Sequence, residues 1–176
     1  MIIKETKIKD AFLIEAEEIS DERGFFARIF CHEEIEKLGF SFHIMQSSYS
    51  YNKKKGTVRG MHFQIAPHEE IKIVTCLQGA IYDVIIDLRK DSESYGQWQA
   101  FELNSYLKSL IIPKGCAHGF QALEDETLLF YQISEKYHPE CSRGIRWNDS
   151  FCKITWPLPI TVIAKKDQEF IPWNNV

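Results

Sequence analysis

Short runs of β-branched and aromatic residues, separated by turn-forming residues at close intervals, are the feature that most restricts the fold of this 176-residue chain. Such runs favour β-strands, and their close spacing is typical of a sandwich or barrel. The clearest predicted strands span residues 71–77, 80–88, 97–103, 109–112, 127–134 and 160–163. We therefore predict an all-β fold.

Two local patterns add detail to this prediction. Gln78-Gly79 separates the first two predicted strands and indicates a hairpin turn between them. Residues 32–38 form the one credible helix, with Gly39 as its stop signal. Glu33, Glu34 and Glu36 favour the N-terminal half of this helix. We expect the helix to connect strands at the periphery.

The predicted strand at residues 80–88 carries two aspartates on one face. Strict alternation places Asp83 and Asp87 on the same side as Ile81 and Ile85. An exposed sheet face accounts for Asp87. Asp83 becomes a candidate site residue if that face lines the interior of a barrel.

Composition limits the class of protein and its partners. The net charge of −4 and the pI of about 5.9 argue against a sequence-independent nucleic-acid-binding protein, although a local basic pocket remains compatible with them. The chain length suits a single domain covering residues 1–176. Charged residues interrupt the N-terminal segment early, and no apolar stretch reaches transmembrane length. Five scattered cysteines without a CxxC motif fit reduced thiols. We expect a soluble cytoplasmic protein without a membrane partner.

The segment Gly-Thr-Val-Arg-Gly-Met-His-Phe-Gln at residues 56–64 is the strongest functional signal. His62 can exchange protons near neutral pH, whereas Arg59 stays charged and suits a phosphate or carboxylate. The pair predicts a site for an anionic substrate that undergoes proton transfer. A core histidine beside a surface arginine is the simpler alternative.

Two glycine-containing segments resemble the signature motifs of the cupin jelly-roll superfamily. Five residues separate Gly56 from His62, and residues 113–118 read Pro-Lys-Gly-Cys-Ala-His. Metal-binding cupins carry a second histidine at the position of Gln64, and Lys72 places a competing cation nearby. The resemblance therefore implies a jelly roll, with one or two short peripheral helices and no metal. The alternative is a metal-dependent cupin that uses His62, His118 and Glu69 or Glu70.

Longer segments, in the same order and with similar spacing, resemble the nucleotide-diphospho-4-keto-6-deoxysugar 3,5-epimerases over nearly the whole chain. These segments are residues 21–26, 56–64, 83–89 with Gly96, 113–120 and 137–139. The resemblance implies a homodimer in which strands near the N-terminus cross to the neighbouring subunit. It also implies inversion of C3, C5 or both in a nucleotide-linked 4-keto sugar, through an enolate and without any cofactor.

The resemblance assigns four residues to this chemistry. His62 is the expected general base, and Asp167 is the carboxylate that orients it. Lys72 is expected to stabilise the enolate oxygen, and Tyr131 to return a proton from the opposite face. Asp167 has the weakest flanking match, and a helix cap or turn residue is its alternative interpretation.

Further residues match the family's substrate-binding positions. Arg23 and Arg59 would hold the diphosphate, whereas Phe26 and Tyr137 would stack against the nucleotide or sugar. Gln46, His118 and Asp83 match positions that line the expected sugar pocket. His118 and Asp83 would form a hydrogen-bonded pair there, or they would give only structural support.

Two positions depart from the pattern of the rhamnose-pathway enzymes. Arg28 stands where they carry a glutamate, and Ser48 stands where they carry an asparagine. Arg28 either contacts a phosphate or base or is a surface arginine. Both changes fall in segments associated with substrate binding, so the nucleotide stays open. Inversion at C3, C5 or both also stays open, as do a 3,4-ketoisomerase and a binding domain without catalysis.

Overall fold

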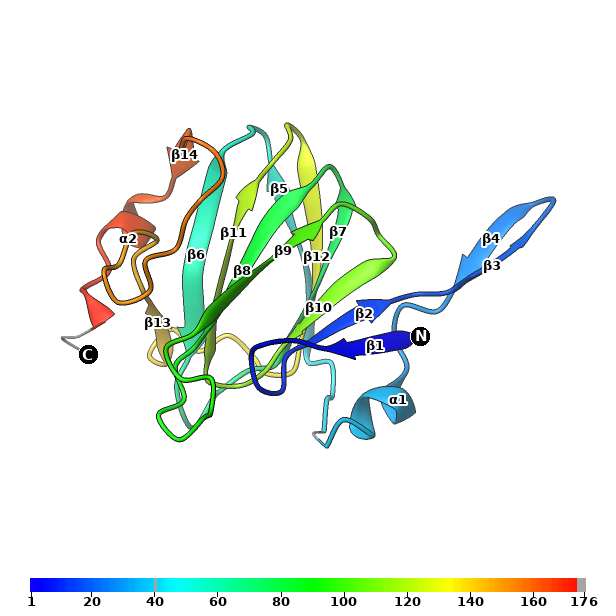
Figure 1. The fold of residues 1–176 in the computed structure, drawn as a ribbon, viewed down its shortest axis with the longest axis horizontal. Coiled ribbons are helices and arrows are strands. Elements are labelled where there is room, and N and C mark those ends of the chain that lie inside the picture. Colours follow the sequence, from blue (N-terminus) through cyan, green and yellow to red (C-terminus); the bar gives the residue numbers. More distant parts are fainter. Residues whose placement is uncertain (40, 174–176) are drawn as a thin grey trace.

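The computed structural model describes residues 1–39 and 41–173 and is built almost entirely from strands (Figure 1). The strands, in chain order, are β1 (Ile2–Glu5), β2 (Phe12–Glu15), β3 (Glu18–Asp21), β4 (Gly24–Ala27), β5 (Gln46–Asn52), β6 (Thr57–Gln64), β7 (Lys72–Gln78), β8 (Ile81–Asp87), β9 (Trp98–Leu103), β10 (Lys108–Ile112), β11 (Cys116–Ala122), β12 (Thr127–Ile133), β13 (Ser142–Gly144) and β14 (Val162–Ile163). The two short helices are α1 (His32–Glu36) and α2 (Lys165–Gln168).

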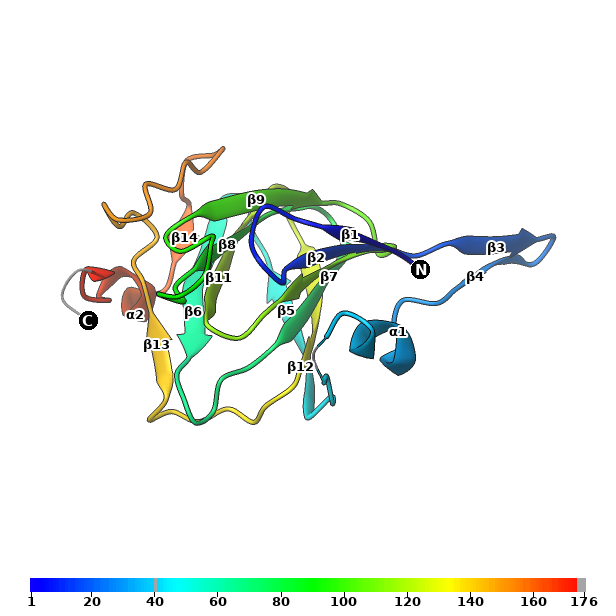
Figure 2. The ribbon, with the colours of Figure 1, turned by 60° about the horizontal axis from the view of Figure 1, so that its bottom comes forward.

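Two antiparallel sheets face each other. One sheet has the strand order β1-β2-β10-β7-β12-β5, and the other has the order β13-β6-β11-β8-β9, with β14 pairing in parallel with β6. Strands β3 and β4 pair only with each other and project away from the body as a hairpin (Figures 1 and 2). The two sheets with their crossing connections form the predicted jelly roll.

Apolar side chains from both sheets fill the space between them. Val74 and Leu129 of one sheet contact Ile81, Ile85 and Phe120 of the other in a single buried cluster. The interior is therefore closed by packing over most of its length.

Both sheets are also covered on part of their outer faces. The C-terminal segment packs Trp156 and Trp173 against the outer face of the second sheet. Helix α1 packs Ile35, which is fully buried, against the outer face of the first sheet together with Phe42 and Ile73. The C-terminal segment thereby becomes part of the body and brings α2 close to β6.

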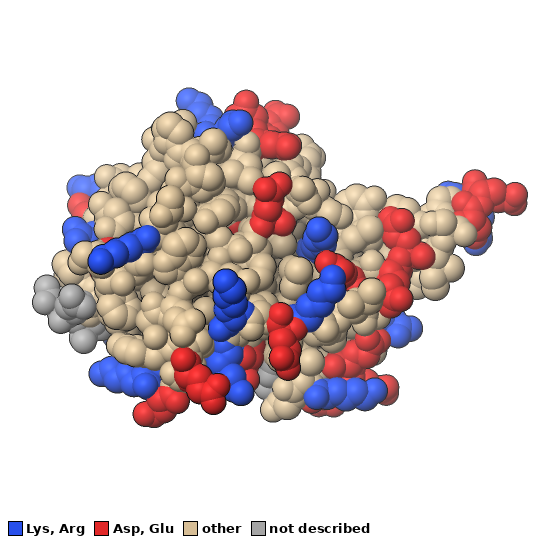
Figure 3. Space-filling view, in the orientation of Figure 1, with Lys and Arg blue, Asp and Glu red and all other residues tan. Residues whose placement is uncertain are grey.

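The predicted all-β jelly roll with short helices is confirmed. Each strand predicted from the sequence overlaps an observed strand, and the helix predicted at residues 32–38 is α1. All five cysteines are free, and all but Cys31 are buried. Among the described residues, no helix is both long and apolar enough to cross a membrane. Lysine, arginine, aspartate and glutamate intermingle on the face shown in Figure 3, without a large basic patch.

The predicted hairpin turn at Gln78-Gly79 is wrong. Strand β7 pairs with β10 and β12, whereas β8 pairs with β9 and β11, so the turn carries the chain from one sheet to the other. Gly79 is still required, because its φ is +76° and an added Cβ would lie 2.5 Å from Thr127 Oγ1. The turn residues were recognised, but the pairing partners are set by distant strands.

The expectation of an exposed face at Asp87 is also wrong. Asp87 and Asp83 are both fully buried, because β8 lies between β11 and β9 and is covered on both faces. Asp87 is held by the Arg89 guanidinium, whose Nη2 lies 2.8 Å from Oδ2, and by the Ser94 hydroxyl at 2.6 Å. Burial alone raises the pKa of Asp87, but these hydrogen bonds outweigh it and lower the pKa to about 2.

Candidate active site

A cavity of about 440 Å³ opens between the two sheets. One wall comes from β5, β7 and β12, and the other from β6 and β11, with α2 at its rim. Its lining includes eight residues predicted from the sequence: Gln46, Arg59, His62, Lys72, His118, Tyr131, Tyr137 and Asp167. Residues more than one hundred positions apart in the chain therefore meet in one space.

His62 and Asp167 form a close pair at the cavity wall. His62 Nε2 lies 2.7 Å from Asp167 Oδ1. Burial raises the pKa of Asp167, but the hydrogen bond from His62 and the charges around it outweigh burial and leave the pKa below its usual range. An ionised carboxylate only accepts hydrogen bonds, so Nε2 carries the proton of a neutral His62. The lone pair is then on Nδ1, which has no hydrogen-bond partner among the described residues.

A tight crossing of β6 and β11 fixes this pair. The Gly60 backbone N–H donates to Asp167 Oδ2 at 3.2 Å, which anchors the second carboxylate oxygen. Gly60 has a φ of +128°, and an added Cβ would clash with Gly119 Cα. Only glycine therefore permits the approach of the two backbones at this point.

A β-bulge gives Arg59 the same orientation as His62. His62 is opposite His118 and Arg59 is opposite Phe120, so three steps on β6 match two steps on β11. The extra residue shifts the alternation of side chains, which lets Arg59 and His62 both line the cavity. Arg59 Nε donates to Asn52 Oδ1 at 2.8 Å, and no carboxylate neutralises its charge within the described part of the chain.

Lys72 enters the cavity from the opposite sheet. Its side chain is 11% exposed, and Nζ lies 2.8 Å from Glu70 Oε1 and 3.4 Å from the His62 carbonyl oxygen. Gln64 Nε2 donates to the other oxygen of Glu70 at 3.2 Å. The ammonium group is thus held by its own ion pair beside His62.

Tyr131 stands on the first sheet, on the opposite wall from His62. Burial raises the pKa of the Tyr131 phenol well above its usual range, so the hydroxyl keeps its proton. On the second sheet, His118 contacts the Tyr131 ring, with ring centroids 6.0 Å apart, and its Nε2 lies 2.6 Å from Asp83 Oδ1; both His118 and Asp83 are buried. Asp83 Oδ2 is buried without a hydrogen-bond partner. The predicted His118–Asp83 pair is therefore present, with His118 at the cavity surface and Asp83 behind it.

Three predicted binding residues lie outside the cavity. Arg23, Phe26 and Arg28 belong to the β3–β4 hairpin or directly follow it, and Phe26 is 70% exposed. The Arg23 guanidinium forms an ion pair with Asp21 two residues away, and Arg28 Nη1 lies 3.5 Å from Glu34 Oε1. The hairpin extends away from the sheets, so these residues do not reach the cavity of their own chain (Figures 1 and 2).

The side chains of the alternative metal site are already engaged in other contacts. His62 Nε2 is bonded to Asp167, His118 Nε2 to Asp83 and Glu70 to Lys72. Gln64 uses both ends of its amide, accepting from the His138 N–H at 2.6 Å and donating to the His68 carbonyl at 3.0 Å. Among the described residues, this set does not form a group spaced for one ion. The geometry argues against a metal-dependent cupin centre here.

Several lining residues were not predicted. Lys166 precedes Asp167 and adds a second basic group to the rim, and its position next to a predicted residue was a usable signal. Further lining residues come from β5 and β13, among them Tyr49, Ser50 and Ser142, and none of these had been assigned to the site. Ser48, recognised as a departure from the family pattern, also lines the cavity.

Comparisons with known proteins agree with this geometry. A family model described as dTDP-4-dehydrorhamnose 3,5-epimerase matches residues 5–175. The relative of that name from Escherichia coli K12 is 38% identical over 100% of this chain and 96% of its own. The crystal structure of the Bacillus anthracis enzyme with TDP and PPi bound has a TM-score of 0.92 and 38% identity, covering 97% of this chain and 98% of its own.

The crystal structure of dTDP-4-dehydrorhamnose 3,5-epimerase from Elizabethkingia anophelis has a TM-score of 0.96 at 32% identity, and the match covers 99% of this chain and 97% of that one. Sequence and fold thus agree over nearly the full length of both chains. The chain therefore belongs to the dTDP-4-dehydrorhamnose 3,5-epimerase family, a family of enzymes that epimerise nucleotide-linked 4-keto-6-deoxy sugars.

Proposed function

We propose that the cavity binds a thymidine-diphosphate-linked 4-keto-6-deoxyhexose and inverts C3, C5 or both through an enolate. One observation carries this proposal. A histidine paired with a carboxylate stands on one wall, and a protonated tyrosine stands on the other. Inversion at carbon needs a base and an acid on opposite faces of the sugar.

His62 Nδ1 removes the proton next to the C4 ketone. The hydrogens on C3 and C5 are acidic because the resulting carbanion is delocalised onto the C4 oxygen. Asp167 fixes the tautomer of His62 and stabilises the imidazolium that forms. The Gly60 N–H prevents the carboxylate from turning away.

Lys72 stabilises the negative charge that develops on the C4 oxygen. A charge already held in position is worth roughly 3 to 4 kcal/mol to such a transition state. Glu70 acts as a positioning residue, because its ion pair fixes the ammonium before the substrate arrives. Tyr131 then donates its proton from the opposite face, which inverts the carbon, and proton exchange with solvent restores the tyrosine and histidine.

Arg59 and Lys166 supply positive charge at the rim for the diphosphate. Tyr137, which is 57% exposed, offers a flat surface against which a sugar or base can stack. The bound TDP of the Bacillus anthracis relative supports a thymidine nucleotide here. Arg28 and Ser48 make this nucleotide the part of the proposal that most needs testing.

We also propose a homodimer in which the β3–β4 hairpin of one subunit completes the cavity of the other. The hairpin carries Arg23, Phe26 and Arg28, and it exposes Ile19 at 72% as well. These side chains have the chemistry to bind a nucleotide diphosphate, yet they lie outside the cavity that the described residues of their own chain form. The free thiols of the chain suit the reducing conditions of the cytoplasm.

Proton NMR in deuterated water tests the reaction directly. The protein is incubated with 4-keto-6-deoxy sugars linked to dTDP, GDP and CDP. We expect deuterium to enter at C3, C5 or both with the dTDP sugar, together with inversion at the labelled carbon. His62→Ala should abolish both. Absence of exchange with every sugar would overturn the proposal, and a product with its carbonyl at C3 would identify a ketoisomerase.

A further inference from the structure

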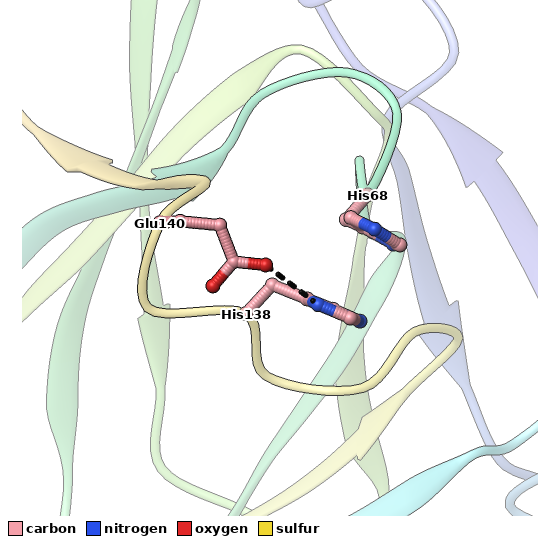
Figure 4. A group of neighbouring side chains, drawn as sticks. All are labelled: His68, His138 and Glu140. Carbon is pink, nitrogen blue, oxygen red and sulfur yellow. Dashed lines mark hydrogen bonds and ion pairs between the residues drawn. The ribbon is translucent and has the colours of Figure 1, made fainter.

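Two loops beside the cavity bring two histidines into contact. His68 lies in the loop between β6 and β7, and His138 lies in the loop between β12 and β13. Their rings are stacked, with centroids 3.4 Å apart and an interplanar angle of 9° (Figure 4). Glu140 Oε1 lies 3.1 Å from His138 Nδ1. The mechanism above uses none of these side chains.

The three residues are spaced as a group of ligands. One ligand atom from each lies within 4.8 Å of the other two, and no other group of histidine, cysteine, aspartate or glutamate in residues 1–39 and 41–173 meets this condition. His68 Nδ1 is buried and has no hydrogen-bond partner. A bound ion would give this buried nitrogen a partner.

Negative charge surrounds the two rings. Glu135 Oε2 lies 3.6 Å from His68 Nδ1, and Glu135 Oε1 lies 4.0 Å from His138 Nε2. Two carboxylates beside two imidazoles attract a divalent cation.

One buried side chain fixes the two loops relative to each other. Gln64 donates to the His68 carbonyl at 3.0 Å and accepts from the His138 N–H at 2.6 Å. Both histidine backbones are therefore tied to the same amide on β6. This anchoring reduces the entropy that a ligand would otherwise lose in bringing the loops together.

We propose that His68, His138 and Glu140 bind one divalent transition-metal ion, with Glu135 or water at a fourth position. Two imidazoles and a carboxylate suit Zn²⁺, Co²⁺ or Ni²⁺ better than Mg²⁺ or Ca²⁺. Metal–nitrogen bonds of about 2.0 to 2.1 Å place the ligand atoms of a tetrahedral site roughly 3.3 Å apart. The groups must therefore close in slightly on binding.

Binding also requires the rings to leave their parallel stack, because the lone pairs of an imidazole lie in the ring plane. The side chains have room to move, since Glu140 is 67% exposed and His138 is 27% exposed. Tyr137 precedes His138 in the chain and lines the cavity. The ion would thus sit at the rim, separate from the His62–Asp167 pair.

Calorimetric titration with Zn²⁺ tests the site in the full-length protein, after treatment with a chelator and removal of that chelator. We expect one ion per chain, and at least tenfold weaker binding in His138→Ala and in Glu140→Gln. His43→Ala is the matched control, because it removes an exposed imidazole from another histidine contact, where the centroids of His32 and His43 are 5.1 Å apart. It should bind as the parent does.

Co²⁺ gives a second measurement, because its visible absorption reports nitrogen and oxygen ligands in a site of low coordination number. Circular dichroism checks that each variant is folded. If His138→Ala is unfolded, the affinity of Glu140→Gln for the ion tests the proposal. Absence of saturable binding below about 1 mM would overturn the proposal. Unchanged affinity in the folded variants would also overturn it. Binding that is lost in His62→Ala but retained in His138→Ala would place the ion in the cavity and would overturn the proposal as well.

Discussion

The cavity and the β3–β4 hairpin contain the same kinds of side chain in opposite surroundings. In the cavity, His62 is held by Asp167 from the C-terminal part of the chain, and Lys72 contacts the His62 carbonyl oxygen on the opposite sheet as well as the nearby Glu70. On the hairpin, Arg23 is paired only with the neighbouring Asp21, and Phe26 is exposed. Within one chain, the residues proposed for proton transfer therefore meet in one cavity, whereas Arg23 and Phe26 of the hairpin lie outside it.

The physical origin of this difference is topology. The sheets that form the cavity are six and five strands wide along their main paths, so backbone pairing on two sides fixes the cavity residues of β6, β7, β11 and β12. The hairpin has two short strands, and every residue of β3 is exposed. A two-stranded hairpin alone is only marginally stable in water. A second subunit would supply the missing contacts, and variants of the cavity and of the hairpin test this difference.

Asp167→Asn should have the largest effect on activity. The amide keeps the shape of the side chain but cannot stabilise the imidazolium, and it favours the wrong tautomer of His62. We expect kcat to fall by about 10²- to 10⁴-fold. Solvent deuterium exchange measures this loss. Lys165→Ala is the control, because Lys165 is 87% exposed on the same helix. An Asp167→Asn enzyme within threefold of the parent would remove Asp167 from the mechanism.

Tyr131→Phe should separate exchange from inversion. His62 can still remove a proton and return deuterium to the same face, so exchange should continue. The proton from the opposite face is missing, so inversion should fall by about 10²-fold or more. NMR measures both rates in one sample. Tyr82→Phe is the control, because Tyr82 packs against Trp156 on the outer face of its sheet. Equal loss of exchange and inversion would contradict this role for Tyr131.

Arg23→Ala tests the hairpin. We expect kcat/KM to fall by about tenfold to a hundredfold through weaker binding of the diphosphate, because a charge-assisted pair is lost. Glu22→Ala, at the same turn, should have little effect.

Co-expression of Arg23→Ala with His62→Ala provides the decisive measurement. In a mixed dimer, the intact His62 of one subunit would meet the intact Arg23 of the other, so activity should reappear. Light scattering and differently tagged chains establish that mixed dimers are present. If such dimers are no more active than the two parents, the hairpin does not complete the neighbouring cavity.

Local patterns in the sequence predict the all-β fold, whereas the jelly roll and most cavity residues are predicted from the resemblance to known families. Strand-forming runs marked the sheets, and glycine-flanked motifs marked His62 and His118. The bulge on β6 could not be predicted, because it depends on pairing with β11. Strict alternation would have placed Arg59 and His62 on opposite faces.

Long-range packing explains the other errors. Gln78-Gly79 has the composition of a hairpin turn, but the partners of β7 and β8 come from elsewhere in the chain. Asp87 follows the alternation of an exposed face, and only the neighbouring strands show that both faces are covered. The separation of Arg23 from the cavity depends on the direction in which a short hairpin leaves the body, which no local pattern encodes.

Asp87→Asn should affect activity least. We expect this buried carboxylate to contribute to the free energy of unfolding and not to catalysis. The pKa of Asp87 is about 2 in the folded chain, below the usual value of an unfolded aspartate near 3.9. Its contribution is therefore complete above about pH 4 and is lost as the pH falls toward 2. We expect the variant to lose about 2 kcal/mol of unfolding free energy at pH 7, with kcat within about threefold of the parent.

Urea unfolding at several pH values from 2 to 7 measures this dependence, and it should be flatter in Asp87→Asn than in the parent. Asp91→Asn is the control, since Asp91 is exposed close by. A large fall in kcat for a folded Asp87→Asn protein would show that Asp87 and the Arg89 network contribute to the cavity. In that case β8 would carry two functional carboxylates. The residues that support proton transfer would then extend beyond the Asp83–His118 pair to Asp87.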